Sequence, residues 1–301
     1  MPIAFIEKPI ALSAPWRIAV FIVAVFAANA LVVVFGFALV SVTPVVQWAR
    51  AARIPLAPLA SVVAAIVATW AAGRIGDRDA PGVWRRIGLG GEAWRPAPVA
   101  WSGGVAVLAL VVPTGVLLLA GAVRFESAAA TDSWLAAAWT ALALMVPAAA
   151  TEELLFRGYL YTACRDLMGP ARTIIATSVV FGLLHIFNAG ATVASIAAVT
   201  VAGVFLGVVR LATGSLVAAF AAHLAFNLTQ AVVLHAPVSG LAAQTPGYRM
   251  VPLGPDWLTG GNWGPEGGAA VMGALLAATF LVGRRAPRSA VSLPIPPAAA
   301  P

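Results

Sequence analysis

The 301-residue sequence contains few charged side chains, because Asp, Glu, Lys and Arg make up 10% of it while 61% of the residues are hydrophobic. Its mean hydropathy is +0.94. Soluble domains normally carry about 25% charged residues, so this composition excludes an ordinary soluble protein and indicates the membrane class. No polar block is long enough to fold separately from the apolar runs. The sequence therefore predicts a polytopic membrane protein without a separate soluble domain.

Cysteine is also scarce, and Cys164 is the single one in the sequence. It cannot form an intrachain disulfide, and no Cys/His spacing typical of a sulfur-ligated zinc site is present. We assign no role to Cys164. The isoelectric point of about 11.0 would suggest a nucleic-acid partner in a soluble protein, but Lys and Arg are spread over loops and termini, where membrane topology explains them. We expect no nucleic-acid partner, and the Ala-, Gly- and Arg-rich composition favours a bacterial inner-membrane protein.

Eight apolar runs follow one another along the chain, and we expect each to be a transmembrane helix. They cover about residues 18–46, 56–73, 99–123, 134–156, 173–187, 191–209, 214–235 and 268–283. The first run is much longer than the roughly 7–15-residue core of a cleaved signal peptide. The fifth and eighth are shorter than the roughly 20 residues that a span needs. The predicted fold class is an all-α polytopic membrane helix bundle.

The distribution of charge predicts the orientation and the parts of this bundle. With eight spans, fourteen of the Lys and Arg residues lie on the side of the N-terminus and four on the other side, so the positive-inside rule places both termini in the cytoplasm. We expect residues 1–133 to form three transmembrane helices with a basic cytoplasmic loop. Residues 134–283 form a core of five helices, and residues 284–301 form a disordered cytoplasmic tail.

The fourth apolar run ends in a cluster of charges. The stretch Thr151-Glu152-Glu153-Leu154-Leu155-Phe156-Arg157-Gly158 places two carboxylates and a guanidinium at its end. A charge inside the bilayer costs at least a few kcal/mol, is normally paired and suggests a functional site. Glu153 and Arg157 are four residues apart and can pair on one helix face. Glu152 is rotated by about 100° from that pair and needs another partner.

Two histidines and an asparagine are predicted to lie at the depth of Glu152. At a rise of about 1.5 Å per residue, Glu152 lies about 12 Å, His185 about 18 Å and His223 about 13 Å from the cytoplasmic surface. Asn227 follows His223 by one helical turn and shares its face. Phe181 lies one turn from His185, where we expect a packing role.

These residue types suit a site that activates water. A carboxylate can act as general base, an imidazole can share the proton, and a second imidazole with a carboxamide can stabilise an oxyanion. Glu152, His185 and His223 could also hold zinc, with water in the open position. The sequence contains no His-Glu-x-x-His motif, so its local spacing does not specify zinc.

The order of these residues is similar to that of a known family. Glu152-Glu153-x-x-x-Arg157, Phe181-x-x-x-His185 and His223-x-x-x-Asn227 resemble the three motifs of the CPBP family, which comprises the CAAX prenyl endopeptidases and the bacteriocin-processing (Abi) intramembrane proteases. The resemblance covers about residues 150–235, and the loop at 259–266 is similar to one in bacterial members. It makes residues 134–283 a protease core that acts on a membrane-associated peptide or protein.

The resemblance also implies a role for each residue. Glu152 and His185 would activate the water, His223 and Asn227 would form the oxyanion site, and Glu153 with Arg157 would brace it. Family members are described both as metalloproteases and as metal-independent glutamate proteases, so zinc stays open. We favour the metal-independent mechanism, because we expect Arg157 to occupy Glu153, the one carboxylate that could support a histidine ligand.

Two alternatives from other functional classes remain. A proton-coupled or ion-coupled transporter would also place Glu, His and Arg inside the membrane, although the sequence has no internal repeat or paired broken helices. A catalytically idle membrane scaffold could keep the same motifs. Taken singly, Glu152 could be a carboxylate at a helix end that reaches the interface, and His185 a hydrogen-bonded core histidine. We expect His235, just before Pro237, to lie at the membrane interface.

Overall fold

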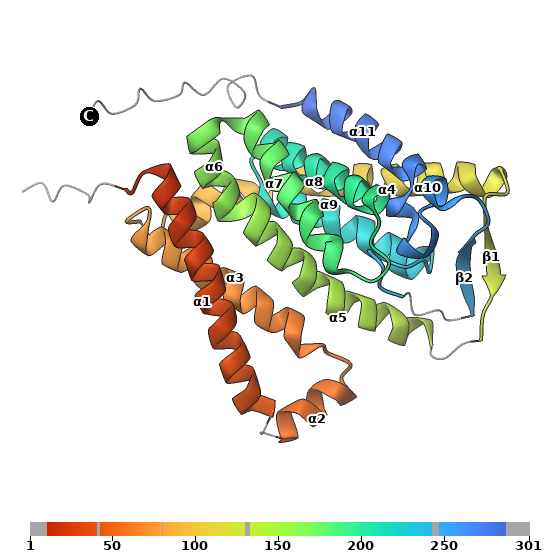
Figure 1. Ribbon diagram of the computed structural model, residues 1–301, viewed down its shortest axis with the longest axis horizontal. Coiled ribbons are helices and arrows are strands. Elements are labelled where there is room, and N and C mark those ends of the chain that lie inside the picture. Colours follow the sequence, from red (N-terminus) through yellow and green to blue (C-terminus); the bar gives the residue numbers. More distant parts are fainter. Residues whose placement is uncertain (1–10, 41–42, 80, 130–132, 243–246, 287–301) are drawn as a thin grey trace, which may run out of the picture.

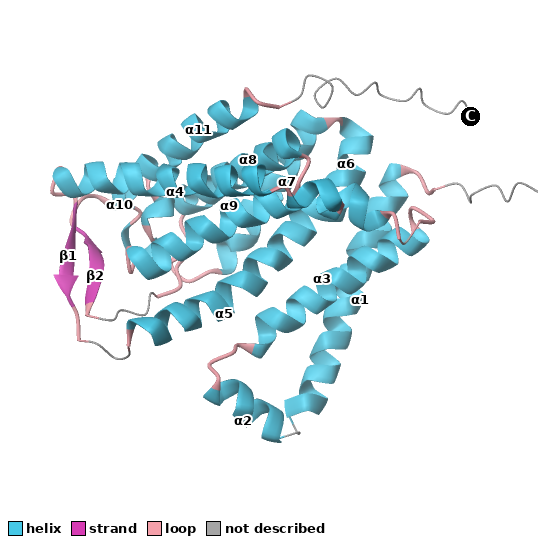
Figure 2. Ribbon diagram, turned by 180° about the vertical axis from the view of Figure 1, so that it is seen from behind, coloured by secondary structure: helices cyan, strands magenta, loops and turns pink. Residues whose placement is uncertain are grey.

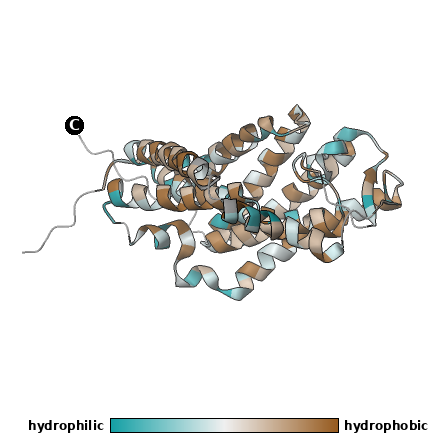
Figure 3. Cartoon of the chain, turned by 90° about the horizontal axis from the view of Figure 1, so that it is seen from below, coloured by the Kyte–Doolittle hydropathy of each residue, from teal (hydrophilic) through white to brown (hydrophobic). Residues whose placement is uncertain are grey.

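The computed structural model describes residues 11–40, 43–79, 81–129, 133–242 and 247–286, and these form a bundle of helices with one small sheet (Figure 1; Figure 2). Most of the predicted tail, residues 287–301, lies outside the described residues. Apolar residues run along the helices in Figure 3. The bundle confirms the predicted all-α architecture.

The N-terminal part is a hairpin of two long helices with a short one between them. It consists of α1 (Ala14–Val40), α2 (Thr43–Ala51) and α3 (Leu56–Ile75), and α1 packs along α3. Only 11% of the most apolar window of α1 is buried within the protein. The remaining apolar surface of α1 needs a lipid environment, because exposed apolar patches of this size are rare in soluble proteins.

Four charged side chains hold the hairpin to the rest of the bundle. Arg17 of α1 contacts Asp77 and Asp166, each at 2.7 Å, and Arg86 contacts the same two aspartates at 2.7 and 3.0 Å. Both aspartates therefore join segments that lie far apart in the sequence. The turn between α3 and α4 contains two short helical segments, η1 (Arg85–Leu89) and η2 (Gly91–Trp94).

Seven further helices complete the bundle in the described part of the chain. They are α4 (Pro96–Leu119), α5 (Trp134–Glu153), α6 (Leu160–Met168), α7 (Pro170–Leu184), α8 (Val193–Thr213), α9 (Leu216–Leu228) and α11 (Ala269–Gly283). Helix α9 contacts α4, α5 and α8. Its Ala218, Ala219 and Ala222 are fully buried, and such small side chains let neighbouring helices approach closely.

Among the described residues, seven helices are long and apolar enough to cross a membrane, and α11 is a shorter apolar helix of 15 residues. The protein is therefore a multi-pass membrane protein, while the count of eight spans, the side of the termini and the division into parts stay predictions. The fourth run differs from its predicted end at residue 156. It continues as one apolar helical segment, Trp134–Met168, of 35 residues.

One antiparallel sheet was not predicted. Strands β1 (Val123–Ser127) and β2 (Tyr248–Pro252) pair so that Val123 lies opposite Pro252. Three short helical segments connect β2 to α11, namely α10 (Asp256–Thr259), η6 (Gly261–Trp263) and η7 (Pro265–Gly267). His235 is buried, with 2% exposure, and its ring packs edge-on against Tyr248 at 4.3 Å between centroids, while its depth at the membrane interface stays a prediction.

Candidate active site

Glu152 and Glu153 are the last residues of α5, where the regular helix changes into wider turns. The segment η3 (Leu154–Tyr159) is a π-helix with a kink at Gly158, whose ψ is −115°. The kink frees backbone groups, and Nε of Arg210 donates to the carbonyl oxygen of Arg157 over 3.3 Å. Single π-turns inside α-helices occur frequently at functional sites. Here the π-turn directly follows the two glutamates.

Glu153 and Arg157 form a buried ion pair. Nη1 of Arg157 lies 3.3 Å from Oε1 of Glu153, and neither side chain is more than 1% exposed. The second guanidinium nitrogen, Nη2, donates to the carbonyl oxygen of Gly203 in α8 over 3.0 Å. The guanidinium carbon lies 4.4 Å from the ring centroid of Phe181. Arg157 therefore joins α8, α7 and the end of α5.

His223 of α9 lies between the two adjacent glutamates. Its Nδ1 is 2.9 Å from Oε1 of Glu153, and its Nε2 is 3.7 Å from Oε2 of Glu152. The expected pair of Glu153 with Arg157 is present, and Oε1 of Glu153 also contacts His223, which the sequence did not predict. An ionised carboxylate only accepts hydrogen bonds, so Nδ1 of His223 carries the hydrogen. Its Nε2 then faces Glu152.

His185 opens the short segment η4 (His185–Phe187) at the end of α7. Its Nδ1 lies 2.8 Å from the carbonyl oxygen of Phe181, and a carbonyl only accepts, so Nδ1 is the donor and Nε2 is free to accept. The Phe181 ring centroid lies 4.7 Å from that of His185 and 6.3 Å from that of His223. Phe181 therefore packs against both imidazoles and the Arg157 guanidinium.

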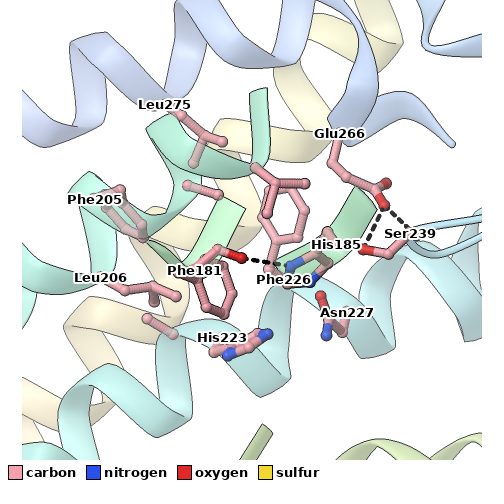
Figure 4. A pocket seen from close by; sticks show the side chains of 13 residues that line it. Phe181, His185, Phe205, Leu206, His223, Phe226, Asn227, Ser239, Glu266 and Leu275 are labelled. Atoms are coloured by element: carbon pink, nitrogen blue, oxygen red, sulfur yellow. Dashed lines mark hydrogen bonds between the residues drawn. The ribbon is translucent and has the colours of Figure 1, made fainter. Parts of the chain in front are cut away.

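Phe181, His185, His223 and Asn227 line one cavity of about 50 Å³ (Figure 4). Apolar side chains of α8, α9 and α11 complete its wall, and the volume suffices for a water molecule. Glu152 approaches from the side of His223, with a side chain that is 32% exposed. Among the described residues, no hydrogen bond or ion pair joins Glu152 to His185 or Asn227. Of the three residues expected to surround Glu152, only His223 contacts it in this part of the chain.

Two further polar residues line this cavity, and the sequence did not single them out. They are Ser239, which follows η5 (Thr229–Val233), and Glu266 in η7. Glu266 is 6% exposed. Burial raises the pKa of its carboxyl to about 8, while hydrogen bonds from Ser239 act in the opposite direction. The signal in the sequence was the loop at 259–266, which ends in Glu266 and to which we had assigned no role in the site.

The predicted zinc ligands were tested against the geometry of the described residues. Glu152 and His223 approach each other, but no group of three His, Cys, Asp or Glu side chains in this part of the chain lies close enough to hold a metal ion. The arrangement of Glu152, His185 and His223 thus does not fit a three-ligand zinc centre. We derive no step through a metal.

The comparison with known proteins gives one match. The sequence model of the family described as type II CAAX prenyl endopeptidase, Rce1-like, matches residues 133–229. This segment runs from the start of α5 to the end of α9 and contains Glu152, His185, His223 and Asn227. No curated protein and no solved structure matches the chain. The match covers less than half of the 301-residue chain, and residues 133–229 are similar to the Rce1-like family of type II CAAX prenyl endopeptidases.

Proposed function

We propose that the protein is an intramembrane endopeptidase that hydrolyses a peptide bond of a membrane-associated protein or peptide. One observation carries the proposal, namely His223 held between Glu152 and Glu153 beside the cavity that Asn227 and His185 line. The family match over residues 133–229 supports it, since that family is described as CAAX-type endopeptidases. The location in a bacterial inner membrane is part of the same proposal.

In this mechanism the attacking water lies beside Glu152 and His223. The 3.7 Å between Oε2 of Glu152 and Nε2 of His223 is too long for a direct hydrogen bond, and a water that touches both can donate one hydrogen to each. One of the water's two lone pairs can then point to the scissile carbonyl. Glu152 takes the proton as general base while the oxygen attacks.

Glu153 and Arg157 support this step without touching the substrate. Glu153 fixes the tautomer of His223 through Nδ1, and Arg157 keeps Glu153 ionised. The contact with Glu153 places a hydrogen on Nδ1 of His223, so in the neutral ring Nε2 carries none and can accept from the water. This differs from the role that the resemblance implied for His223, because an unprotonated Nε2 cannot donate to an oxyanion.

Asn227 and His185 act on the substrate side of the cavity. The carboxamide of Asn227 donates to the oxyanion that forms when water adds to the carbonyl. Nε2 of His185 is not engaged by the bond from Nδ1 to Phe181, so it can accept a hydrogen bond from the substrate. When the tetrahedral intermediate breaks its carbon–nitrogen bond, Glu152 returns the proton to the leaving amine.

The test is a cleavage assay with the full chain reconstituted in liposomes. Two fluorogenic substrates are compared, a farnesylated CAAX peptide and an unmodified single-span peptide. We expect the protein to cleave at least one, and Glu152→Gln to lower kcat by about 10²–10⁴-fold. The matched control is Glu92→Gln, since the Glu92 side chain is 82% exposed and lies outside the cavity.

The transporter alternative gives a different result in the same liposomes. It predicts proton or ion flux that depends on Glu152, measured with an internal pH dye, together with no cleavage of either peptide. That outcome would overturn the endopeptidase proposal. Cleavage that is equally fast in the Glu152→Gln and Glu92→Gln variants would remove Glu152 from the mechanism.

A further inference from the structure

The loop at residues 236–241 is attached to the turn that carries His185. The backbone N–H of Asn188 donates to the carbonyl oxygen of His185 over 3.0 Å. The side-chain amide of the same Asn188 donates to the carbonyl oxygen of Ser239, also over 3.0 Å. Asn188 therefore connects Ser239 to the end of α7, where His185 begins η4.

Glu266 holds the other side of Ser239. Its Oε1 accepts hydrogen bonds from the backbone N–H and the hydroxyl of Ser239. Its Oε2 accepts from the amide of Gln230, which also donates to the carbonyl oxygen of Pro237. Glu266 thus links the start of α11, the end of α9 and the loop. Figure 4 shows Glu266 and Ser239 on the same side of the cavity as His185.

The loop has a backbone that needs such support. Ser239 has a φ of 49°, in the left-handed region that non-glycine residues rarely adopt, and such residues persist only when their surroundings hold them. Gly240 follows with a φ of 81°, and a Cβ at that position would lie 2.2 Å from the carbonyl oxygen of Ala189. The loop therefore lies in close contact with the turn after η4.

We propose that Glu266 is a positioning residue of the candidate active site, which holds Ser239 and, through Asn188, sets the position of His185 along the cavity wall. The proposal rests on the proposed endopeptidase function. The titratable groups that face Glu266 across the cavity are His185 and His223. The raised pKa of Glu266, about 8, fits a carboxyl group whose task is to hold neighbours in a buried place, since a neutral carboxyl still accepts the Ser239 hydrogen bonds.

The kinetic test compares Glu266→Gln with Glu266→Ala in the reconstituted full chain. The Gln variant keeps a carbonyl oxygen that can accept from Ser239, so we expect its kcat within threefold of the wild type. The Ala variant removes that acceptor, and we expect kcat to fall at least tenfold while KM changes less than threefold. Glu92→Ala, at an exposed site, is the matched control. Equal losses of kcat in the Gln and Ala variants would overturn the positioning role, because the charge itself would then matter.

A second measurement does not depend on activity. Ser239→Cys is introduced in a Cys164→Ser background, and its rate of maleimide labelling is measured with Glu266 present and with Glu266→Ala. We expect labelling at least tenfold faster in the Ala variant, because the loop is released from the cavity. Equal rates would overturn the proposal. If the wild type cleaves no peptide, the endopeptidase function fails, and the labelling rates still decide whether Glu266 holds Ser239.

Discussion

The Nδ1 atom of His223 lies 2.9 Å from Oε1 of Glu153, an oxygen that also receives the Arg157 guanidinium at 3.3 Å. Glu153 thus contacts both the guanidinium of Arg157, which stays charged, and the imidazole of His223, which can titrate. The arrangement leaves the second ring nitrogen of His223 free to face Glu152. The two adjacent glutamates thus approach opposite ring nitrogens of His223.

Loss of Arg157 should destabilise the whole protein. Removing one partner of a buried ion pair leaves an uncompensated charge and costs about 3–5 kcal/mol, so we expect Arg157→Ala to lower the free energy of unfolding by that amount. Thermal or denaturant unfolding in detergent measures it. Arg124→Ala is the control, because its pair with Glu126 is more exposed and such pairs contribute about 0–1 kcal/mol. Similar losses in both variants would contradict the role given to the buried pair.

Asn227→Ala should affect the chemical step. The loss of one oxyanion donor typically costs about 10²–10³-fold in kcat, and KM should change little, because the interaction is made mainly in the transition state. Steady-state kinetics with the cleaved peptide measure both constants. Asn29→Ala, at an exposed position of α1, serves as the control. A rise in KM at unchanged kcat would place Asn227 in substrate binding instead.

Activity should persist after treatment with a chelator. Glu153 contacts His223 in the way that a carboxylate supports a metal-ligating histidine, so the pairing of Glu153 with Arg157 does not exclude zinc. However, the described residues bring no three suitable ligands together. Metal analysis and activity are measured on the same sample. One equivalent of zinc, whose removal abolishes cleavage and whose return restores it, would refute the metal-independent mechanism and leave the protease proposal intact.

Labelling of single cysteines should reveal the topology. In a Cys164→Ser background, a cysteine at exposed Glu92 should react only from the cytoplasmic side, and one at Trp257, which is 62% exposed, only from the opposite side. The uneven distribution of Lys and Arg between the two sides motivates this prediction. Labelling of both positions from one side would refute the predicted number of spans between them.

Glu266 should make the protein less stable as the pH rises. Its pKa is about 8 in the folded protein against an ordinary value of 4.5, so between these pH values the folded state binds more protons than the unfolded state. Stability therefore falls across this window as the pH increases. Compared with Glu266→Gln, the wild type should lose unfolding temperature between pH 5 and pH 8. A wild-type unfolding temperature that stays constant or rises relative to that of Glu266→Gln between pH 5 and pH 8 would contradict the raised pKa of Glu266.

Much of the candidate site was predictable from local patterns. Spacing of four residues placed Glu153 with Arg157 and His223 with Asn227, and the rise per residue placed Glu152 and His223 at similar depths. These rules describe residues on one regular helix or on straight antiparallel helices. They could not predict that Glu153 would also contact His223, because that contact depends on how the end of α5 packs against α9 at the π-turn.

The remainder depends on contacts between distant segments. Glu266 enters the cavity from a Gly/Pro-rich loop, and its contact with Gln230 spans 36 residues. The pairing of β1 with β2 joins strands of five residues each that lie more than a hundred residues apart. Neither has a periodic pattern in the sequence. Hydrophobic periodicity indicates which face of an element is buried. It does not indicate which distant segment a loop contacts.

The π-helix at the end of α5 decides how α6 is oriented. A π-turn holds one residue more than the regular α-turn that it replaces. Regular α-helical winding of the same residues, Leu154–Tyr159, would therefore turn α6 by about 100° relative to the glutamates. The anchor of α6 to α1 through Asp166 and the contact of Glu153 with His223 could then not both form.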